Sequence, residues 1–141
     1  MTLPDAIRFA AIHHGDTLDY GKQPFIGHPL RVMASVAASQ LPVNGLILAA
    51  TVLHDVIEDT DVVSDDLRDA GFPKYVVEIV NVLTRRSDDK YEDYIRKIKD
   101  FGYPAVNIKI CDIKDNLNPA RSLPGLNLSK RYIQALKVLE K

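Results

Sequence analysis

The segment TVLHDVIEDT, residues 51–60, begins as an apolar helix and then places four polar residues within six positions: His54, Asp55, Glu58 and Asp59. On one continuous helix, residues four apart share a face, so that His54 would lie over Glu58 and Asp55 over Asp59. Carboxylates stacked in this way repel each other, and burial strengthens the repulsion. A divalent cation relieves it, because carboxylate oxygens and imidazole nitrogens are ordinary ligands of such ions. The pattern favours a metal site at the end of this segment.

Two residues outside this segment are candidates to complete the coordination shell. His28, in FIGHPL, lies at a predicted loop-to-helix junction, and Asp112, in KICDIKDNL, interrupts an otherwise apolar helical face. With His54 and Asp55 they give two imidazoles and two carboxylates, a mixed set that suits Mn²⁺, Fe²⁺ or Zn²⁺ better than Mg²⁺. A cation with an open coordination position would lower the pKa of a bound water. The residues placed to orient or deprotonate that water are Glu58 and Asp59.

Each of these residues also has a structural interpretation. A single histidine on a helix is more often a hydrogen-bonded structural residue than a ligand, and Glu58, Asp59 and Thr60 could be the solvated end of a helix. Asn116 shares a helical face with Asp112, four residues earlier, and could either contact a ligand or end that helix. The joint pattern, with a His-Pro upstream and an aspartate in a later apolar helix, favours the metal site.

Helix signals recur along the whole chain. Thr2, Pro4 and Asp5 form a capping pattern before the first apolar-periodic segment, and prolines open several later segments. The segment 106–117 alternates like a strand over its first half, but its length and the proline before it favour a helix. We predict an all-α fold of seven or eight helices, with the segment 42–59, apolar nearly all round, as the buried central helix. The expected helices cover residues 2–14, 28–39, 42–59, 64–71, 73–86, 88–102, 104–118 and 128–140.

Composition narrows the class of protein. The 141 residues are 46% hydrophobic and 26% charged, which indicates one folded domain over residues 1–141. The net charge of -1 argues against a dedicated nucleic-acid binder. The single cysteine, Cys111, excludes an internal disulfide and fits a reducing compartment. The first ten residues lack a signal-peptide pattern, and no apolar run approaches the roughly 20 residues that span a bilayer. We therefore expect a soluble, cytoplasmic protein, and the sequence leaves its oligomeric state open.

Three segments carry a resemblance to a known family. PFIGHPLRV, AATVLHDVIEDT and VNIKICDIKDNL are similar, in order and spacing, to signature segments of the RelA/SpoT-type hydrolase domains, which belong to the HD superfamily of metal-dependent phosphohydrolases. The segments LTRRSDDKYEDYI and RYIQALKVL extend the resemblance over nearly the whole chain. The small stand-alone members of the group look most similar.

The resemblance implies a compact HD-type helical bundle and a set of residue roles. It implies one Mn²⁺ bound through His28, His54, Asp55 and Asp112, with Glu58 and Asp59 activating the attacking water. It also implies that Asn116 contacts the nucleotide and that Tyr132 lies near its phosphates. The reaction best known in the family removes the 3′-pyrophosphate of (p)ppGpp. A synthetase domain does not fit in 141 residues, so we expect no synthetic activity.

One region departs from the family pattern. The family typically has a basic pair after its first His-x-Gly element, and the arginine of that pair helps to hold the guanine base. Leu18 and Asp19 stand at this place here, and Lys22 follows in a different register. The sequence therefore leaves open which nucleobase the substrate carries. The alternatives are a phosphomonoesterase, a dNTP hydrolase or a silent nucleotide-binding module. Further candidates for phosphate contact are Arg85 and Lys109.

Overall fold

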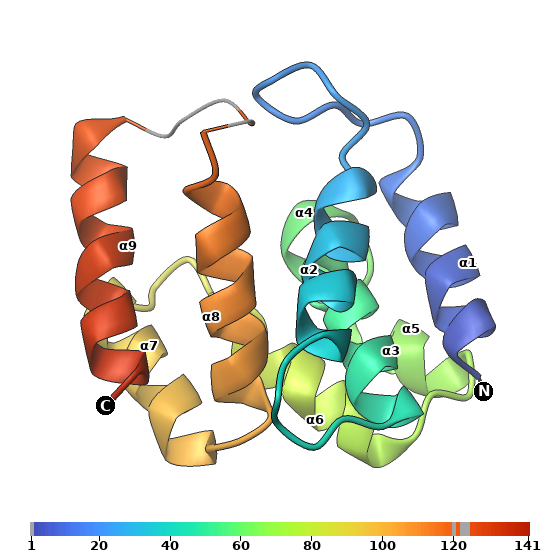
Figure 1. The fold of residues 1–141 in the computed structure, drawn as a ribbon. Helices are drawn as coiled ribbons and strands as arrows, with labels where there is room; N and C mark the ends of the chain where they lie inside the picture. Colours follow the sequence, from blue (N-terminus) through green and yellow to red (C-terminus); the bar gives the residue numbers. More distant parts are fainter. Residues whose placement is uncertain (1, 120, 122–124) are drawn as a thin grey trace.

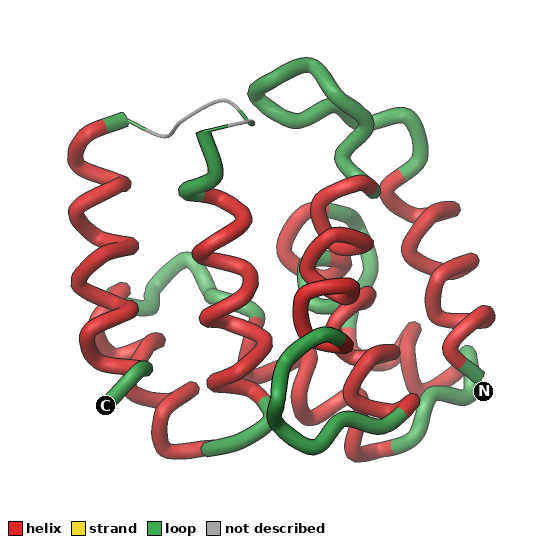
Figure 2. Tube along the Cα trace, in the orientation of Figure 1, coloured by secondary structure: helices red, strands yellow, loops and turns green. Residues whose placement is uncertain are grey.

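The computed structural model describes residues 2–119, 121 and 125–141, and it confirms the predicted all-α class (Figure 1). Short connections join most of the helices (Figure 2). The extended backbone among the described residues includes an isolated antiparallel bridge between Leu18 and Pro24. The helices in this part of the chain are α1 (Leu3–His14), α2 (Gly27–Ala37), α3 (Gly45–Leu53), α4 (Val56–Asp59), α5 (Ser64–Asp69), α6 (Lys74–Leu83), α7 (Tyr91–Phe101), α8 (Ala105–Asn116) and α9 (Leu126–Leu139).

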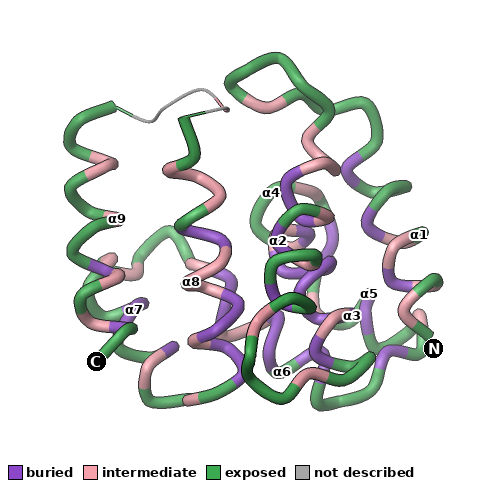
Figure 3. The backbone as a smooth tube through the Cα atoms, in the orientation of Figure 1, coloured by how far each residue is buried: buried purple, intermediate pink, exposed green. Residues whose placement is uncertain are grey.

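Helix α3 is the centre of the bundle. It packs against α1, α2 and α6, and its buried positions lie all around its axis, as an apolar helix with no polar face requires. Helix α8 packs against α2 on one side and against α7 and α9 on the other. Buried residues form one hydrophobic cluster with members from α1 to α9, and Figure 3 colours these buried positions along the helices.

Local signals set several helix ends. The Thr2 N–H donates to the Asp5 carboxylate at 2.8 Å, as the capping pattern predicts. Asn44, rather than Pro42, caps α3, because its Oδ1 accepts from the Ile47 N–H at 3.0 Å. Gly15 follows α1 with a φ of 54°, a conformation in which glycine avoids the steric cost of a side chain. The next stretch, residues 15–26, is a loop that lies above α2 in Figure 1.

The predicted continuous helix over 42–59 is wrong in one respect that matters for the site. The chain leaves the α-helix at His54 and Asp55, where the His54 N–H bonds to the Thr51 carbonyl three residues back, at 3.3 Å. A single helical turn, α4, follows. At this turn Asp55 contacts His28 of α2 and His54 contacts Asp112 of α8. The expected proximity of Asp55 and Asp59 is kept on α4, because the Asp59 N–H bonds to the Asp55 carbonyl four residues back at 2.9 Å and their carboxylate oxygens lie within 4.8 Å of each other.

The ambiguous segment 106–117 is helical, as predicted, since α8 covers most of it. The helix predicted over 73–86 ends earlier, at Leu83, and the last helix begins earlier than expected, at Leu126. In the described part of the chain, no helix combines the length and apolar character needed to cross a bilayer.

Candidate active site

Four side chains from three parts of the bundle meet at the corner between α3 and α4. His28 comes from the start of α2, His54 and Asp55 from the corner itself, and Asp112 from the middle of α8. One ligand atom of each lies within 4.8 Å of the others. His28 Nε2 is 2.8 Å from Asp112 Oδ1 and 3.3 Å from Asp55 Oδ2, and His54 Nε2 is 3.3 Å and 3.2 Å from the same two oxygens. Adjacent ligands of an octahedral ion with bonds of about 2.1 Å lie about 3 Å apart, so this set can hold a divalent cation.

Both imidazoles are oriented by a second partner. His54 Nδ1 lies 2.6 Å from the Thr51 carbonyl, which can only accept, so Nδ1 carries the hydrogen and Nε2 faces the other ligands. His28 Nδ1 lies 2.6 Å from Asp115 Oδ2, a carboxylate that fixes the ring in the same way. Metal-binding histidines usually have such a second partner, because it fixes the tautomer and the direction of the ring. The donor set therefore fits a metal centre better than a structural pair of histidines.

The charges of the cluster balance one another. Burial alone would lower the pKa of His28, but hydrogen bonds to Asp112, Asp115 and Asp55 raise it to about 11. The pKa of His54 is raised in the same way, to about 10, by Asp55 and Asp112 against its own burial. The imidazolium protons thus compensate the carboxylates as a cation would. A bound cation competes with these protons for the same nitrogens.

Lys109 contacts the cluster directly, through Asp112. Its Nζ is 2.8 Å from Asp112 Oδ2, and it sits 5.2 Å from the centre of the Tyr94 ring. Only 12% of its side chain is exposed, and the negative charge of Asp112 outweighs the desolvation, so its pKa is raised well above the usual value. Because Lys109 occupies Oδ2, Asp112 presents Oδ1 to the histidines and to a cation.

Glu58 and Asp59 lie beside the cluster on α4. With Asp55 they form a second group whose carboxylate oxygens lie within 4.8 Å of one another. Loss of hydration, together with the negative charge of Asp55, raises the pKa of both and brings that of Asp59 to about 7. Glu58 Oε1 accepts from the Arg85 backbone N–H at 2.7 Å, which fixes the direction of this carboxylate. A carboxylate with a raised pKa next to a metal cluster is suited to accept a proton near neutral pH.

A cavity of about 590 Å³ extends from this cluster to the loop 15–26. We call the part of the cavity lined by His28, Asp55 and Asp112 the metal end, and we count with it His54, which contacts Asp55 and Asp112. We call the outer part of the cavity the loop end. The loop end is lined by Leu18, Asp19, Tyr20, Asn116, Arg121, Leu128 and Tyr132. Glu58 and Asp59 also line the cavity, next to Asp55.

The structure places most of the predicted substrate contacts in this cavity. Asn116, Lys109 and Tyr132 line it, and partial burial raises the pKa of the Tyr132 hydroxyl to about 12, so it remains a donor at neutral pH. Arg85 is absent from the described lining of this cavity. Its guanidinium donates to the Asp89 carbonyl at 3.1 Å and lies 5.3 Å from the Tyr91 ring centre, and its backbone reaches Glu58 instead.

Two residues of the site escaped the sequence reasoning. Asp115 lies three residues after Asp112 on α8 and contacts His28, so helical spacing could have indicated it. Arg121 follows α8 and bonds to Asp115 Oδ2 at 2.9 Å. No periodicity points to Arg121, because it lies outside the helices.

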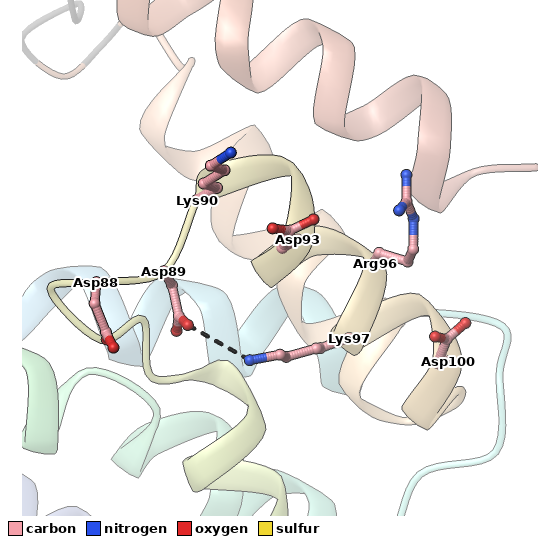
Figure 4. A pocket seen from close by; sticks show the side chains of 7 residues that line it. All are labelled: Asp88, Asp89, Lys90, Asp93, Arg96, Lys97 and Asp100. Carbon is pink, nitrogen blue, oxygen red and sulfur yellow. Dashed lines mark hydrogen bonds and ion pairs between the residues drawn. The ribbon is translucent and has the colours of Figure 1, made fainter.

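A second hollow, of about 440 Å³, lies along α7 (Figure 4). Acidic and basic side chains are mixed around it, and Lys97 pairs with Asp89 at 3.4 Å. None of its residues belongs to the groups that could share a metal ion among the described residues. It is a solvated charged surface lined by Asp88, Asp89, Lys90, Asp93, Arg96, Lys97 and Asp100.

Comparison with known proteins agrees with this geometry. The chain is 40% identical over 135 residues to a guanosine-3′,5′-bis(diphosphate) 3′-pyrophosphohydrolase of Vibrio cholerae, covering 91% of this chain and 19% of that protein. It is 30% identical over 135 residues to the bifunctional (p)ppGpp synthase/hydrolase SpoT of Escherichia coli, with the same two coverages. The resemblance to RelA/SpoT-type hydrolases is confirmed. No protein-family model matches the chain.

A solved structure shows the same fold. It is described as a metazoan ortholog of SpoT that hydrolyzes ppGpp and plays a role in starvation responses. It superposes with a TM-score of 0.75 at 23% identity, over 98% of this chain and 81% of that one. The chain spans about a fifth of the length of the two curated RelA/SpoT-type relatives named above, so it corresponds to one domain-sized part of them.

Proposed function

We propose that this protein is a metal-dependent nucleotide pyrophosphohydrolase that removes the 3′-pyrophosphate of (p)ppGpp or a related nucleotide. The observation that carries the proposal is the four-ligand cluster at the base of a cavity whose wall bears Glu58 and Asp59. Similarity to proteins named for this reaction supports the same assignment. The volume of the cavity also lies in the range of small-molecule sites, about 300–1,000 Å³.

The residues that would hold the cation are His28, His54, Asp55 and Asp112. Mn²⁺ suits their two nitrogens and two carboxylates, and Fe²⁺ or Zn²⁺ are the alternatives. When bound, such an ion acts as a Lewis acid that makes water a better nucleophile at neutral pH. The second partners of the imidazoles, Asp115 and the Thr51 carbonyl, keep both Nε2 atoms directed at the ion.

The proton of the attacking water would pass to the carboxylate pair on α4. Glu58 is held by the Arg85 backbone N–H through one oxygen, which leaves its other oxygen to accept that proton. Asp59 would serve as a second proton acceptor beside Glu58, because its pKa of about 7 lets it exchange a proton at neutral pH. Lys109 and Tyr132 would donate to phosphate oxygens from the cavity wall, while Asn116 would contact the nucleotide. In this proposal Arg85 acts through its backbone.

The test is a panel of nucleotides incubated with Mn²⁺ and, in parallel, with a chelator. The panel contains (p)ppGpp, its adenosine counterpart and ordinary nucleoside triphosphates. We expect pyrophosphate release from a 3′-pyrophosphorylated nucleotide, and none with the chelator. If no member of the panel releases phosphate or pyrophosphate with Mn²⁺, the proposal is wrong.

One observation favours a second candidate of the same chemistry. Leu18 and Asp19 stand where the resemblance leads us to expect a basic pair, so the base or the phosphate pattern of the substrate could differ. In that case the protein would be an HD-type phosphomonoesterase or dNTP hydrolase. The released product separates the two, because a phosphomonoesterase yields inorganic phosphate rather than pyrophosphate. The cytoplasmic location stays a prediction from sequence.

A further inference from the structure

Arg121 joins three parts of the cavity wall at its loop end. Its Nη1 donates to Asp115 Oδ2 and to Asn116 Oδ1, both at 2.9 Å, on the last turn of α8, and it also lies 3.1 Å from His28 Nδ1. Its Nη2 lies 3.4 Å from Asp19 Oδ2 in the loop 15–26. The guanidinium is mostly enclosed, with 17% of the side chain exposed. A planar fork of donors can serve several acceptors at once, which a single ammonium group does less well.

The contact with Asn116 fixes the orientation of its amide. A guanidinium has donors only, so the Asn116 atom that faces it must be the oxygen. The two Nδ2 hydrogens are then the groups that Asn116 can offer to a ligand in the cavity. Without Arg121 the amide could turn and present its oxygen instead, because the two orientations differ little in shape. Arg121 thereby decides whether this position of the wall donates or accepts.

The contact with Asp19 ties the loop to α8. Asp19 is fixed within the loop, where its Oδ1 accepts from the Gln23 N–H at 3.0 Å and its N–H donates to the Gln23 carbonyl at 2.8 Å. The Phe25 N–H also donates to the Thr17 carbonyl at 2.8 Å. These hydrogen bonds hold the loop together, and the Arg121 guanidinium links the loop, through Asp19, to the end of α8. Both the loop and Asn116 line the cavity.

We propose that Arg121 is a positioning residue for nucleotide binding, which holds the Asn116 amide with its N–H groups toward an oxygen acceptor of the nucleotide and braces the loop 15–26 against α8. The proposal rests on the proposed nucleotide hydrolase function. It assigns Arg121 to substrate binding, although the same guanidinium also supports Asp115, the carboxylate partner of His28. Arg121 supplies no ligand atom to the cation, so its loss should raise KM while metal remains bound.

Arg31 provides a matched control. Its Nε lies 3.0 Å from Asp115 Oδ1, so Arg31→Ala and Arg121→Ala each remove one guanidinium from the same carboxylate. Arg31 is more exposed, at 42% of its side chain, and is absent from the described lining of the cavity. We expect Arg121→Ala to raise KM for (p)ppGpp about tenfold and Arg31→Ala to change it less than about threefold. Equal effects in the two variants would mean that Arg121 acts only through Asp115, and would overturn the proposal.

Two further variants separate the roles of charge and geometry. Arg121→Lys keeps the charge but loses the fork, so its KM should lie between those of the wild type and Arg121→Ala. Asn116→Asp keeps an oxygen for Arg121 but removes the donors, and it should raise KM at least as much as Arg121→Ala. A wild-type KM in Asn116→Asp would refute the assigned direction of the amide.

Hydrogen exchange tests the brace without any substrate. In Arg121→Ala the Asp19 and Phe25 amides should exchange faster than in the wild type, and in Arg31→Ala they should not. Unchanged exchange in Arg121→Ala would overturn the bracing role. Because this measurement needs no turnover, it distinguishes failure of the Arg121 proposal from failure of the proposed hydrolase function. A chain that hydrolyses no nucleotide but shows the exchange difference would refute the function and retain the brace.

Discussion

The metal end and the loop end of the cavity share helix α8 but are built in different ways. At the metal end the four ligand side chains are 2–15% exposed, and the two histidines and Asp112 contact partners of opposite charge or a carbonyl through both of their polar atoms. At the loop end Leu18 and Tyr20 are 56% and 96% exposed, and one guanidinium, that of Arg121, contacts both Asn116 and Asp19. The buried end tolerates almost no change of residue type, because any unpaired charge there costs several kcal/mol.

This difference suggests that the two ends of the cavity have different functions. In the proposed function the enclosed end would fix the chemistry, because two imidazoles and two carboxylates balance the charge of a divalent cation. The exposed end can vary with little cost to folding, and it is the end that would contact the base and sugar. We therefore expect substitutions at the metal end to remove activity outright and substitutions at the loop end to change KM.

The largest effect should follow from removing a metal ligand. His54→Ala or Asp55→Ala leaves the remaining carboxylates without part of their compensation, so bound metal should be lost and activity should fall about 10³-fold or more. Elemental analysis and pyrophosphate release measure the two quantities. His13→Ala, which removes an exposed histidine of α1, is the control and should retain both. A His54→Ala protein with stoichiometric metal would contradict the assignment.

Replacing Glu58 should separate metal binding from turnover. Glu58→Ala should lower kcat about 10²- to 10⁴-fold while metal remains bound, because it removes the proton acceptor and no ligand. Glu58→Gln keeps an oxygen for the Arg85 N–H and should lose a similar part of kcat. Steady-state kinetics with metal analysis on the same samples provide the test. Unchanged kcat in both variants would exclude Glu58 as the base.

The pH dependence of metal binding should identify the metal end as a proton-binding cluster. The pKa values of His28 and His54 are raised to about 11 and about 10, so a cation must displace protons at neutral pH. Affinity should then rise about tenfold per pH unit for each proton displaced. Calorimetry in buffers of different ionisation enthalpy counts the protons released on metal binding. An affinity independent of pH between 7 and 9 would contradict the protonated state of His28 and His54.

The same shifts predict how the chelated protein responds to pH. A raised histidine pKa adds stability that is complete below about pH 6.5, the usual imidazole value, and is lost as the pH rises through about 10 and 11. The Tm with a chelator should therefore fall from pH 7 to pH 10. With Mn²⁺ it should fall less, so the gap between the two curves widens.

The smallest effect should come from the loop end. Tyr132→Phe keeps the ring in the cavity wall and removes one hydroxyl donor, so KM should rise only about two- to tenfold, with metal content unchanged. Kinetics on this variant beside Asp55→Ala measure the contrast directly. Loss of metal in Tyr132→Phe would mean that the two ends are coupled, and the division between them would fail.

The prediction of helices from sequence succeeded because capping residues, prolines and apolar spacing act locally. Asp5 caps the first helix through a contact three residues away, and the apolar character of the 42–59 segment required its central burial. The ligand candidates were also readable from sequence. Histidine and aspartate are poor residues for an apolar helix, so His54, Asp55 and Asp112 needed a compensating partner.

Tertiary packing decided which residues from distant parts of the chain contact one another. At the corner formed by His54 and Asp55, these side chains contact His28 of α2 and Asp112 of α8, which lie far away in sequence. The roles of Asp115 and Arg121 likewise depend on contacts up to 102 residues away in sequence. The sequence determined which residues need a partner, because that need is a property of each side chain. The partners themselves were decided by the folded chain, because hydrogen bonds between distant segments exist only once packing brings them together.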